Sequence, residues 1–232
     1  MKIKITFISD THTKHKMLDG QLPGGDVLIH SGDIMNSGYS KYEVEDFCKW
    51  FEKQNYDKRI FIAGNHDRLF EDEPEETMEI INEYDVNYLQ DNELLIGEEW
   101  ETQVKIWGSP WQPEFYNWAF NLPRGGQDLM RVWNQIPKDT GILITHGPPQ
   151  GHLDISGPPY NNGDLGCSLL RVIVDKIKPK IHVFGHIHGS YGYRFHNETH
   201  FFNASVLNEN YNQTNKPLTV IWDSETNEIE FV

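Results

Sequence analysis

Five short polar motifs in this sequence combine side chains that bind divalent metal ions. In chain order they are Asp10-Thr11-His12, Gly32-Asp33, Gly64-Asn65-His66-Asp67, His146-Gly147 and Gly185-His186-Ile187-His188. Together they supply carboxylate, imidazole and amide ligands but no thiolate. This mixture suits manganese, iron, zinc or nickel, and it differs from the cysteine-rich set of a structural zinc site. The motifs therefore predict a metal centre that performs chemistry.

The number of candidate ligands favours a site for two metal ions. Two ions roughly 3.5–4 Å apart can bind the attacking and the leaving oxygen of an in-line displacement, with one carboxylate bridging them. A hydroxide bridging the ions is a nucleophile near neutral pH, so no serine or cysteine nucleophile is required. A nearby imidazole can then protonate the leaving oxygen. The chemistry that these residue types support is hydrolysis of a phosphate ester.

Each motif alone is a weak indication. A single Asp-x-His or Gly-Asp pair lies more often in a turn than at a metal ion, whereas Gly-Asn-His-Asp and Gly-His-x-His after a strand are more specific. The presence of all five motifs in this order is what supports the site. We interpret the other histidines as structural or surface residues, namely His30, His152, His182, His196 and His200, and His15 stays ambiguous because it follows the first motif.

Short apolar strands must position these motifs. The segments rich in β-branched and aromatic residues are Ile3–Ile8, Val27–His30, Arg59–Ala63, Ile142–Thr145 and Ile181–Phe184, and each runs into a polar or glycine-rich turn. Near-continuous apolar runs are typical of strands buried on both faces of a sheet. Sites in open α/β folds gather at the carboxyl ends of such strands, which is where the motifs lie.

Helices are expected between these strands. Ser40 and Glu43 form a capping-box pattern ahead of one helix, and 169–177 places apolar residues on one helix face before Pro179. The acidic stretch 71–76 suits the exposed start of a surface helix. The last strands have no helix between them and are expected at Tyr191–Phe195, His200–Asn203, Leu218–Trp222 and Glu228–Val232. The pattern predicts an α/β fold of layered sheets with helices outside, in one domain over residues 1–232.

The segment Trp107–Gly126 shows no regular pattern and is rich in aromatic residues. A long loop inside a compact domain is often a lid or a pocket wall, and the alternative is an apolar plug over a sheet edge. A nucleobase could stack on Trp111, Phe115 or Trp118. Arg124 could contact a phosphate or a ribose.

The composition is that of an acidic protein with a hydrophobic core. The 232 residues include 38% hydrophobic ones, and the formal net charge is −15, which disfavours long nucleic acid as a substrate. No apolar run approaches the roughly 18 residues of a membrane span, and the first residues do not resemble a signal peptide. We therefore expect a cytoplasmic protein whose Cys48 and Cys167 are reduced and buried. The oligomeric state is left open.

With these motifs the sequence resembles the calcineurin-like metallophosphoesterase superfamily, and in particular its metallophosphoesterase-domain-containing branch, first described in vertebrate brain. The matching stretches are ISDTH, LPGGDVLIHSGD, WGSPWQP, FNLPRG, THGPP, KPKIHVFGHIH and NAS, and the resemblance extends from about Ile8 to Pro217. It implies a four-layer α/β/β/α sandwich of two mixed sheets flanked by helices. It also implies hydrolysis of phosphodiesters, with nucleoside cyclic phosphates as the leading candidates, and a dependence on two metal ions, with manganese favoured in vitro.

The resemblance further implies a role for each motif residue. One ion would be held by Asp10, His12 and His188, the other by Asn65, His146 and His186, and Asp33 would bridge both. His66 would protonate the leaving group or stabilise the transition state. The alternatives are a broad phosphomonoesterase or nuclease of the same superfamily, and a metal-binding, nucleotide-binding scaffold without catalysis. The scaffold is disfavoured because every ligand position and His66 are present.

One departure from the family pattern concerns the second motif. Protein serine/threonine phosphatases of the superfamily carry GDxxDRG, whereas this sequence has Asn36 in place of the aspartate that orients the catalytic histidine and Ser37 in place of a phosphate-contacting arginine. The departure argues against a protein phosphatase. It also leaves open how His66 is oriented, because Asp67 would have to turn back to reach it.

Overall fold

The computed structural model describes residues 1–97, 103–157 and 163–232, and within these ranges it contains two six-stranded mixed sheets. The first sheet has the order β14-β13-β1-β2-β3-β4, from β1 (Lys2–Ile8), β2 (Gly25–His30), β3 (Tyr56–Phe61), β4 (Asn87–Tyr88), β13 (Leu218–Asp223) and β14 (Glu228–Phe231). The second has the order β11-β12-β10-β9-β6-β5, from β5 (Asn92–Ile96), β6 (Val104–Ser109), β9 (Ile142–Thr145), β10 (Ile181–Phe184), β11 (Gly192–His196) and β12 (Thr199–Asn203). In each sheet the inner strands are mainly parallel, and antiparallel pairs lie towards the edges.

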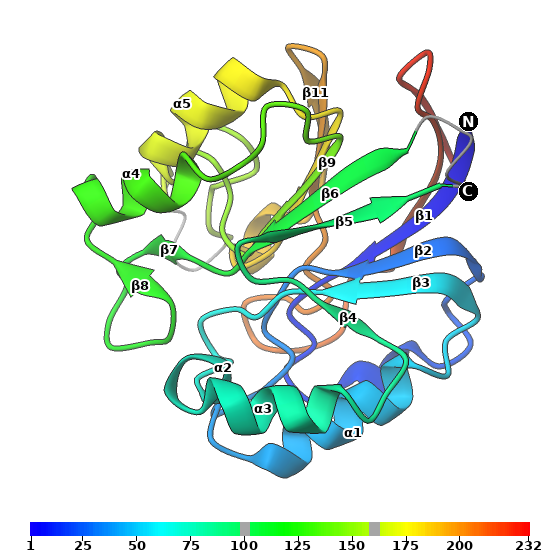
Figure 1. Ribbon diagram of the computed structural model, residues 1–232, viewed down its shortest axis with the longest axis vertical. Helices are drawn as coiled ribbons and strands as arrows, with labels where there is room; N and C mark the ends of the chain where they lie inside the picture. Colours follow the sequence, from blue (N-terminus) through cyan, green and yellow to red (C-terminus); the bar gives the residue numbers. More distant parts are fainter. Residues whose placement is uncertain (98–102, 158–162) are drawn as a thin grey trace.

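Helices cover the outer faces of both sheets (Figure 1). The first sheet carries α1 (Lys41–Phe51), α2 (Leu69–Asp72) and α3 (Pro74–Ile81), and the second carries α4 (Gln127–Trp133) and α5 (Ser168–Ile177). Two short 3-10 helices, η1 (His15–Leu18) and η2 (His188–Ser190), lie in the connections. This arrangement confirms the layered α/β fold predicted from the sequence pattern and the four-layer α/β/β/α sandwich that the family resemblance implied.

Alternating side chains divide the core into layers. Along β1, Ile3, Ile5 and Phe7 belong to the cluster between the two sheets, whereas Ile8 belongs to the cluster under α1. Successive side chains of a strand point to opposite faces, so a strand covered on both sides is apolar at nearly every position. Phe7 lies 4.6 Å from Phe202 of β12, measured between ring centroids, which shows that the two sheets share one core.

The strand β3 differs from the sequence prediction at both of its ends. β9 and β10 have the predicted bounds, but β3 spans Tyr56–Phe61 instead of Arg59–Ala63. Asp57 and Lys58 are exposed at the start of β3, where polar side chains are compatible with a strand. Ala63 already belongs to the turn that leads into the third motif.

The capping box predicted for α1 is not formed. Ser40 is the N-cap residue with an extended backbone, but within the described part of the chain its side chain makes no capping hydrogen bond. The Glu43 carboxylate instead accepts a hydrogen bond from the backbone N–H of Asn36 at 3.1 Å. The predicted start of the helix was therefore right, and the predicted reason was wrong.

The aromatic segment Trp107–Gly126 contains regular structure, contrary to the prediction. Its first residues complete β6, and β7 (Gln112–Pro113) pairs in parallel with β8 (Asn121–Leu122). Two-residue strands are too short to show a periodic pattern, so the sequence could not reveal them. The residues between β7 and β8, 114–120, are called the β7–β8 loop below.

Several smaller expectations concern buried and exposed residues. Both cysteines are free and buried. Of the histidines interpreted as structural or surface residues, His196 is exposed, and the buried ones are His30, His152, His182 and His200. In residues 1–97, 103–157 and 163–232, no helix combines the length and the hydrophobicity that crossing a membrane requires.

Candidate metal centre

The five motifs meet where the two sheets join at the carboxyl ends of their parallel strands. Ser9, directly after β1 of the first sheet, forms a parallel bridge with Ser205, which follows β12 of the second sheet. The predicted ligands follow β1, β2 and β3 in one sheet and β9 and β10 in the other. Residues far apart in the sequence therefore form one site.

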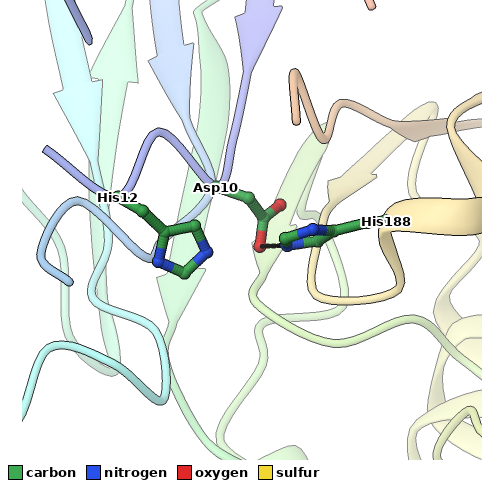
Figure 2. A group of neighbouring side chains, drawn as sticks. All are labelled: Asp10, His12 and His188. Carbon is green, nitrogen blue, oxygen red and sulfur yellow. Dashed lines mark ion pairs between the residues drawn. The ribbon is translucent and has the colours of Figure 1, made fainter. Parts of the chain in front are cut away.

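Asp10, His12 and His188 form one group in this site. Each can offer one ligand atom such that all three atoms lie within 4.8 Å of one another. Figure 2 shows the Asp10 carboxylate between the two rings, with the ion pair from Asp10 Oδ1 to His188 Nε2 at 3.3 Å. The hydroxyl of Ser205 donates to Asp10 Oδ2 at 2.7 Å, and His188 Nδ1 lies 3.0 Å from the carbonyl oxygen of Asn208. Both side chains are thus fixed by a second hydrogen bond.

Asp33 belongs to two further groups, one with His12 and His66 and one with Asp10 and His146. Its Oδ2 atom lies 3.6 Å from His12 Nε2 and 3.4 Å from His146 Nε2. Its Oδ1 atom accepts a hydrogen bond from the backbone N–H of His66 at 2.8 Å. The carboxylate therefore lies between the predicted ligands of the two ions.

Asn65, His146 and His186 are grouped less tightly. His146 Nε2 lies 2.9 Å from Asn65 Oδ1, and His146 Nδ1 lies 3.0 Å from the carbonyl oxygen of Ser31. The His186 ring lies 5.0 Å from the His146 ring between centroids. Among the described residues, His186 is not part of a group of three ligand atoms within 4.8 Å. It does line the same cavity.

The backbone at the predicted ligands is unusual. Asp10, Asp33 and His186 have positive φ angles of 54°, 60° and 64°, a region that residues other than glycine rarely adopt. Such conformations persist only where the surrounding structure enforces them, and they concentrate at functional sites. A Cβ atom on Gly185 would lie 2.1 Å from Asp10 Oδ2, and one on Gly64 would lie 2.3 Å from Asp33 Oδ1. These glycines leave room for the carboxylates of other motifs.

The charges in the site are strongly coupled. Burial opposes ionisation of Asp10 and Asp33, but neighbouring histidines outweigh it and hold the pKa of both carboxyls below their ordinary value. Burial likewise opposes protonation of His146 and His188, but the two carboxylates raise the pKa of each imidazole to about 9. Burial lowers the pKa of His12 to about 4 despite the same carboxylates. Two buried carboxylates thus favour a positive charge beside them.

The donor atoms fit a metal ion. His12 Nε2 is buried and has no hydrogen-bond partner among the residues that the structure describes. Its other nitrogen, Nδ1, lies 3.1 Å from the carbonyl oxygen of Met35. Imidazole ligands usually donate their second ring N–H to a carbonyl or carboxylate, which orients the free nitrogen, and His146 and His188 have the same arrangement.

His66 is oriented by a backbone group. Its Nδ1 atom lies 2.6 Å from the carbonyl oxygen of Asn36, so that the backbone at position 36 takes the place of the missing aspartate side chain. The Asp67 carboxylate accepts hydrogen bonds from backbone N–H groups, including those of Asp33 and Gly64. This contact set answers the question that the sequence left open about His66.

A cavity of about 570 Å³ opens beside these residues. Phe115 and Arg124 line it, as does Trp118. The Arg124 guanidinium donates to the carbonyl oxygens of Leu165 and Gly166 at 3.1 and 2.9 Å, so it also fixes that part of the wall.

Trp111 does not occupy the position that was expected for it. It is not among the described residues that line the cavity, and its indole N–H donates to the Asp91 carboxylate at 2.7 Å. Its ring packs edge-on against Phe120. Through these two contacts Trp111 holds the aromatic segment against the protein.

Three residues near the C-terminal end of the site were missed as site residues. Ser205 and Asn208 hold Asp10 and His188, and Tyr211 lines the cavity with its ring 4.9 Å from the His12 ring between centroids. The NAS stretch at Ser205 was noted only as part of the resemblance. For Asn208 and Tyr211 no spacing or composition in the sequence provides a signal.

Comparison with known proteins now identifies the family. The sequence pattern of the family described as "Calcineurin-like phosphoesterase" matches residues 3–190. The chain belongs to this family. Metallophosphoesterase domain-containing protein 1 of Homo sapiens is 40% identical to it over 235 aligned positions, and the match covers 92% of this chain and 69% of the human protein.

Solved structures show the same fold at low sequence identity. The structure of TT1561 of Thermus thermophilus has a TM-score of 0.67 and 12% identity, and covers 100% of this chain and 99% of its own. Phosphopantetheinyl hydrolase (PptH) from Mycobacterium tuberculosis has a TM-score of 0.59 and 14% identity, with 90% of each chain covered. Membership of the family makes this chain a metal-dependent phosphoesterase of the hydrolase class, with its Asp/His groups as candidate metal ligands.

Proposed function

We propose that this protein hydrolyses phosphodiester bonds of small substrates, with nucleoside cyclic phosphates as the leading candidates, at a centre that holds two metal ions. The main support is the position of Asp33, whose Oδ2 atom lies 3.4 Å from His146 Nε2 and 3.6 Å from His12 Nε2. A carboxylate between two sets of nitrogen ligands is the arrangement that a bridging ligand requires.

The proposed ligands divide into two sets with Asp33 in common. Asp10, His12 and His188 would hold one ion, and Asn65, His146 and His186 would hold the other. When bound, such ions supply Lewis-acid chemistry, which activates water and neutralises the charge of the phosphate. Manganese is the ion we expect to support activity in vitro, and iron, zinc and nickel suit the same donors.

His66 is proposed to act on the leaving oxygen. The Asn36 carbonyl oxygen can only accept a hydrogen bond, so Nδ1 of His66 carries a proton and Nε2 is left for the substrate. His66 lines the cavity beside His12, with the two ring centroids 4.5 Å apart. When Nε2 is protonated as well, the imidazolium in this position can give that proton to a leaving alkoxide or stabilise its charge, which leaves a neutral ring with its proton on Nδ1.

The cavity wall supports a substrate with an aromatic or apolar group. Phe115 lines the cavity and is 54% exposed, so one face of its ring is available. We propose that a nucleotide substrate places its phosphate at the Asp/His ligands and its nucleobase against the cavity wall at Phe115. Arg124 is available beside them for a ribose or phosphate oxygen, although its guanidinium already holds two carbonyl groups.

An Asp33→Asn variant tests the shared carboxylate. It should bind one metal ion or fewer by elemental analysis and lose activity on bis-p-nitrophenyl phosphate with added manganese. The matched control is Asp128→Asn, which makes the same change at an exposed aspartate outside the site. Two tightly bound ions in Asp33→Asn would contradict the bridging role.

A substrate panel tests the bond that is cleaved. The wild-type protein loaded with manganese should have a higher kcat/KM for cyclic nucleotides and other diesters than for p-nitrophenyl phosphate and nucleoside monophosphates. A preference for the monoesters, or cleavage of oligonucleotides in place of small diesters, would refute the proposed substrate class.

A further inference from the structure

Among the residues that the structure describes, one hydrogen bond holds the His66 ring. Its ring nitrogen Nδ1 contacts a backbone carbonyl at position 36, where the protein phosphatases of the superfamily are expected to use a carboxylate. The Asn36 N–H is itself bound by Glu43. A single hydrogen bond at one ring atom fixes that atom but leaves the plane of the imidazole free to tilt.

Trp118 supplies the missing constraint. Its indole stacks on the His66 imidazole, with ring centroids 4.2 Å apart and an interplanar angle of 26°. The His12 ring meets His66 edge-on, at 4.5 Å and 80°. The imidazole is thus covered on one face by Trp118, bounded by a second ring and bonded at Nδ1.

The β7–β8 loop is attached to the segment that carries His66. The backbone N–H of Ala119 donates to the carbonyl oxygen of Asn65 at 3.0 Å, beside His66 itself. Arg68 donates from Nη2 to the carbonyl oxygen of Asn117 at 2.8 Å. These two contacts lie on either side of Trp118, so the indole and the imidazole keep their relative position.

A third hydrogen bond also attaches the β7–β8 loop to the rest of the protein. The backbone N–H of Phe120 donates to the Glu71 carboxylate at 2.9 Å, and Ala119 and Phe120 are fully buried. The end of the loop therefore packs into the protein, while Phe115 and Tyr116 at its tip are exposed. The loop has a fixed part at Trp118 and an open part at the tip.

We propose that Trp118 is the positioning residue of His66, and that the indole stack together with the Asn36 carbonyl replaces the aspartate of the related phosphatases. The proposal rests on the proposed function in so far as His66 acts on the leaving group. It assigns two roles to the β7–β8 loop. Its exposed tip contacts the substrate, and its fixed part at Trp118 orients the imidazole of His66.

The kinetic test uses Trp118→Ala and Trp118→Phe, with Phe115→Ala as a comparison from the same loop. Trp118→Ala should lower kcat on a phosphodiester with a poor leaving group while KM changes little. The loss should stay below the roughly 10²–10⁴-fold expected for His66→Gln, since the acid is misplaced and not removed. The loss of kcat should be smaller for substrates with p-nitrophenolate as the leaving group. Trp118→Phe should recover most of the lost kcat. Phe115→Ala should change KM instead.

A spectroscopic measurement separates this proposal from the proposed function. The ring protons of His66, assigned by their disappearance in His66→Gln, should be shifted by the ring current of the indole. Trp118→Ala should remove that shift and Trp118→Phe should keep part of it. This readout does not depend on turnover, so it tests the stack between Trp118 and His66 even if the wild-type protein cleaves none of the tested diesters, and the kcat of the variants then tests the positioning role.

Two results would overturn the proposal. One is a rise in KM with unchanged kcat in Trp118→Ala, which would make Trp118 a substrate contact. The other is an unchanged set of His66 resonances in a folded Trp118→Ala variant. If thermal melting shows that the alanine variant does not fold, the comparison of wild type with Trp118→Phe and Trp118→Leu provides the same kinetic and spectroscopic tests.

Discussion

The carboxylate of Asp67 accepts a hydrogen bond from the backbone N–H of Asp33 at 2.9 Å. It also accepts from the backbone N–H groups of Met35 at 2.8 Å and Gly64 at 2.7 Å. Asp67 is fully buried. The last residue of the Gly-Asn-His-Asp motif therefore ties together the two loops that carry Asp33 and His66, and it does not itself orient the imidazole.

Replacing Asp67 by asparagine should destabilise the metal-free protein. An amide has one acceptor oxygen, so its NH₂ group would face backbone donors that the carboxylate now satisfies on both oxygens. An unpaired buried donor costs about 1–3 kcal/mol, and the free energy of unfolding in a denaturant titration should fall by at least that amount. An unfolding free energy equal to that of Asp128→Asn would contradict this account.

Removing the Phe115 ring should weaken the binding of nucleotides selectively. Stacking is worth roughly 1–3 kcal/mol per base, so Phe115→Ala should raise KM for nucleotide substrates about five- to a hundred-fold, with a smaller effect on p-nitrophenyl esters. Trp111→Ala is the matched comparison, because its ring belongs to the same segment but bonds to Asp91. It should lower thermal stability and affect all substrates alike. A Phe115→Ala variant with unchanged nucleotide KM would remove this residue from the substrate wall.

Acid should destabilise the protein through histidines outside the metal centre. Burial, with Arg171 and Arg194 nearby, lowers the pKa of His152 to about 4 from its ordinary 6.5. The unfolded chain then binds more protons than the folded one between these values, so stability falls as pH decreases from about 6.5 to about 4. His152→Gln should flatten part of this slope in thermal melts recorded across that range.

The neighbouring His196 provides the control for this pH prediction. It is exposed, and its ring lies 5.3 Å from His152 between centroids. His196→Gln should change the slope far less than His152→Gln, because it removes an exposed ring beside His152 and leaves the buried ring in place. Equal slopes for wild type and His152→Gln would show that His152 contributes nothing to the acid sensitivity.

The sequence was most informative where function depends on residues next to each other in the chain. The motifs and the strands before them are local patterns, which is why the bounds of β9 and β10 could be anticipated, whereas the grouping of Asp10 with His188 was implied by the family resemblance. Parallel strands that end at the same edge of a sheet bring the motifs that follow them close together.

Contacts between distant segments could not be anticipated in the same way. The hydroxyl of Ser205 reaches Asp10 from 195 residues away, and nothing in its local sequence distinguishes it from a turn residue. Glu43 was assigned to a helix cap because its spacing from Ser40 fits one, yet it binds the Asn36 N–H of a different loop. Trp111 and Trp118 were both candidates for stacking on a nucleobase, yet Trp118 lines the cavity and Trp111 bonds to Asp91.

The pairing of β1 has a consequence for how the protein acquires its metal centre. β1 lies between β2 and β13, and β13 spans Leu218–Asp223 close to the end of this chain. Asp10 leaves β1 towards Ser205, which lies 195 residues further along the chain, so the surroundings of Asp10 are complete only after that distant segment has packed against it. Pairings of such long sequence separation form late and slowly. Metal capture during refolding should therefore lag behind the formation of α1 and β3, and its time course would report when the segments around Asp10 and Ser205 have met.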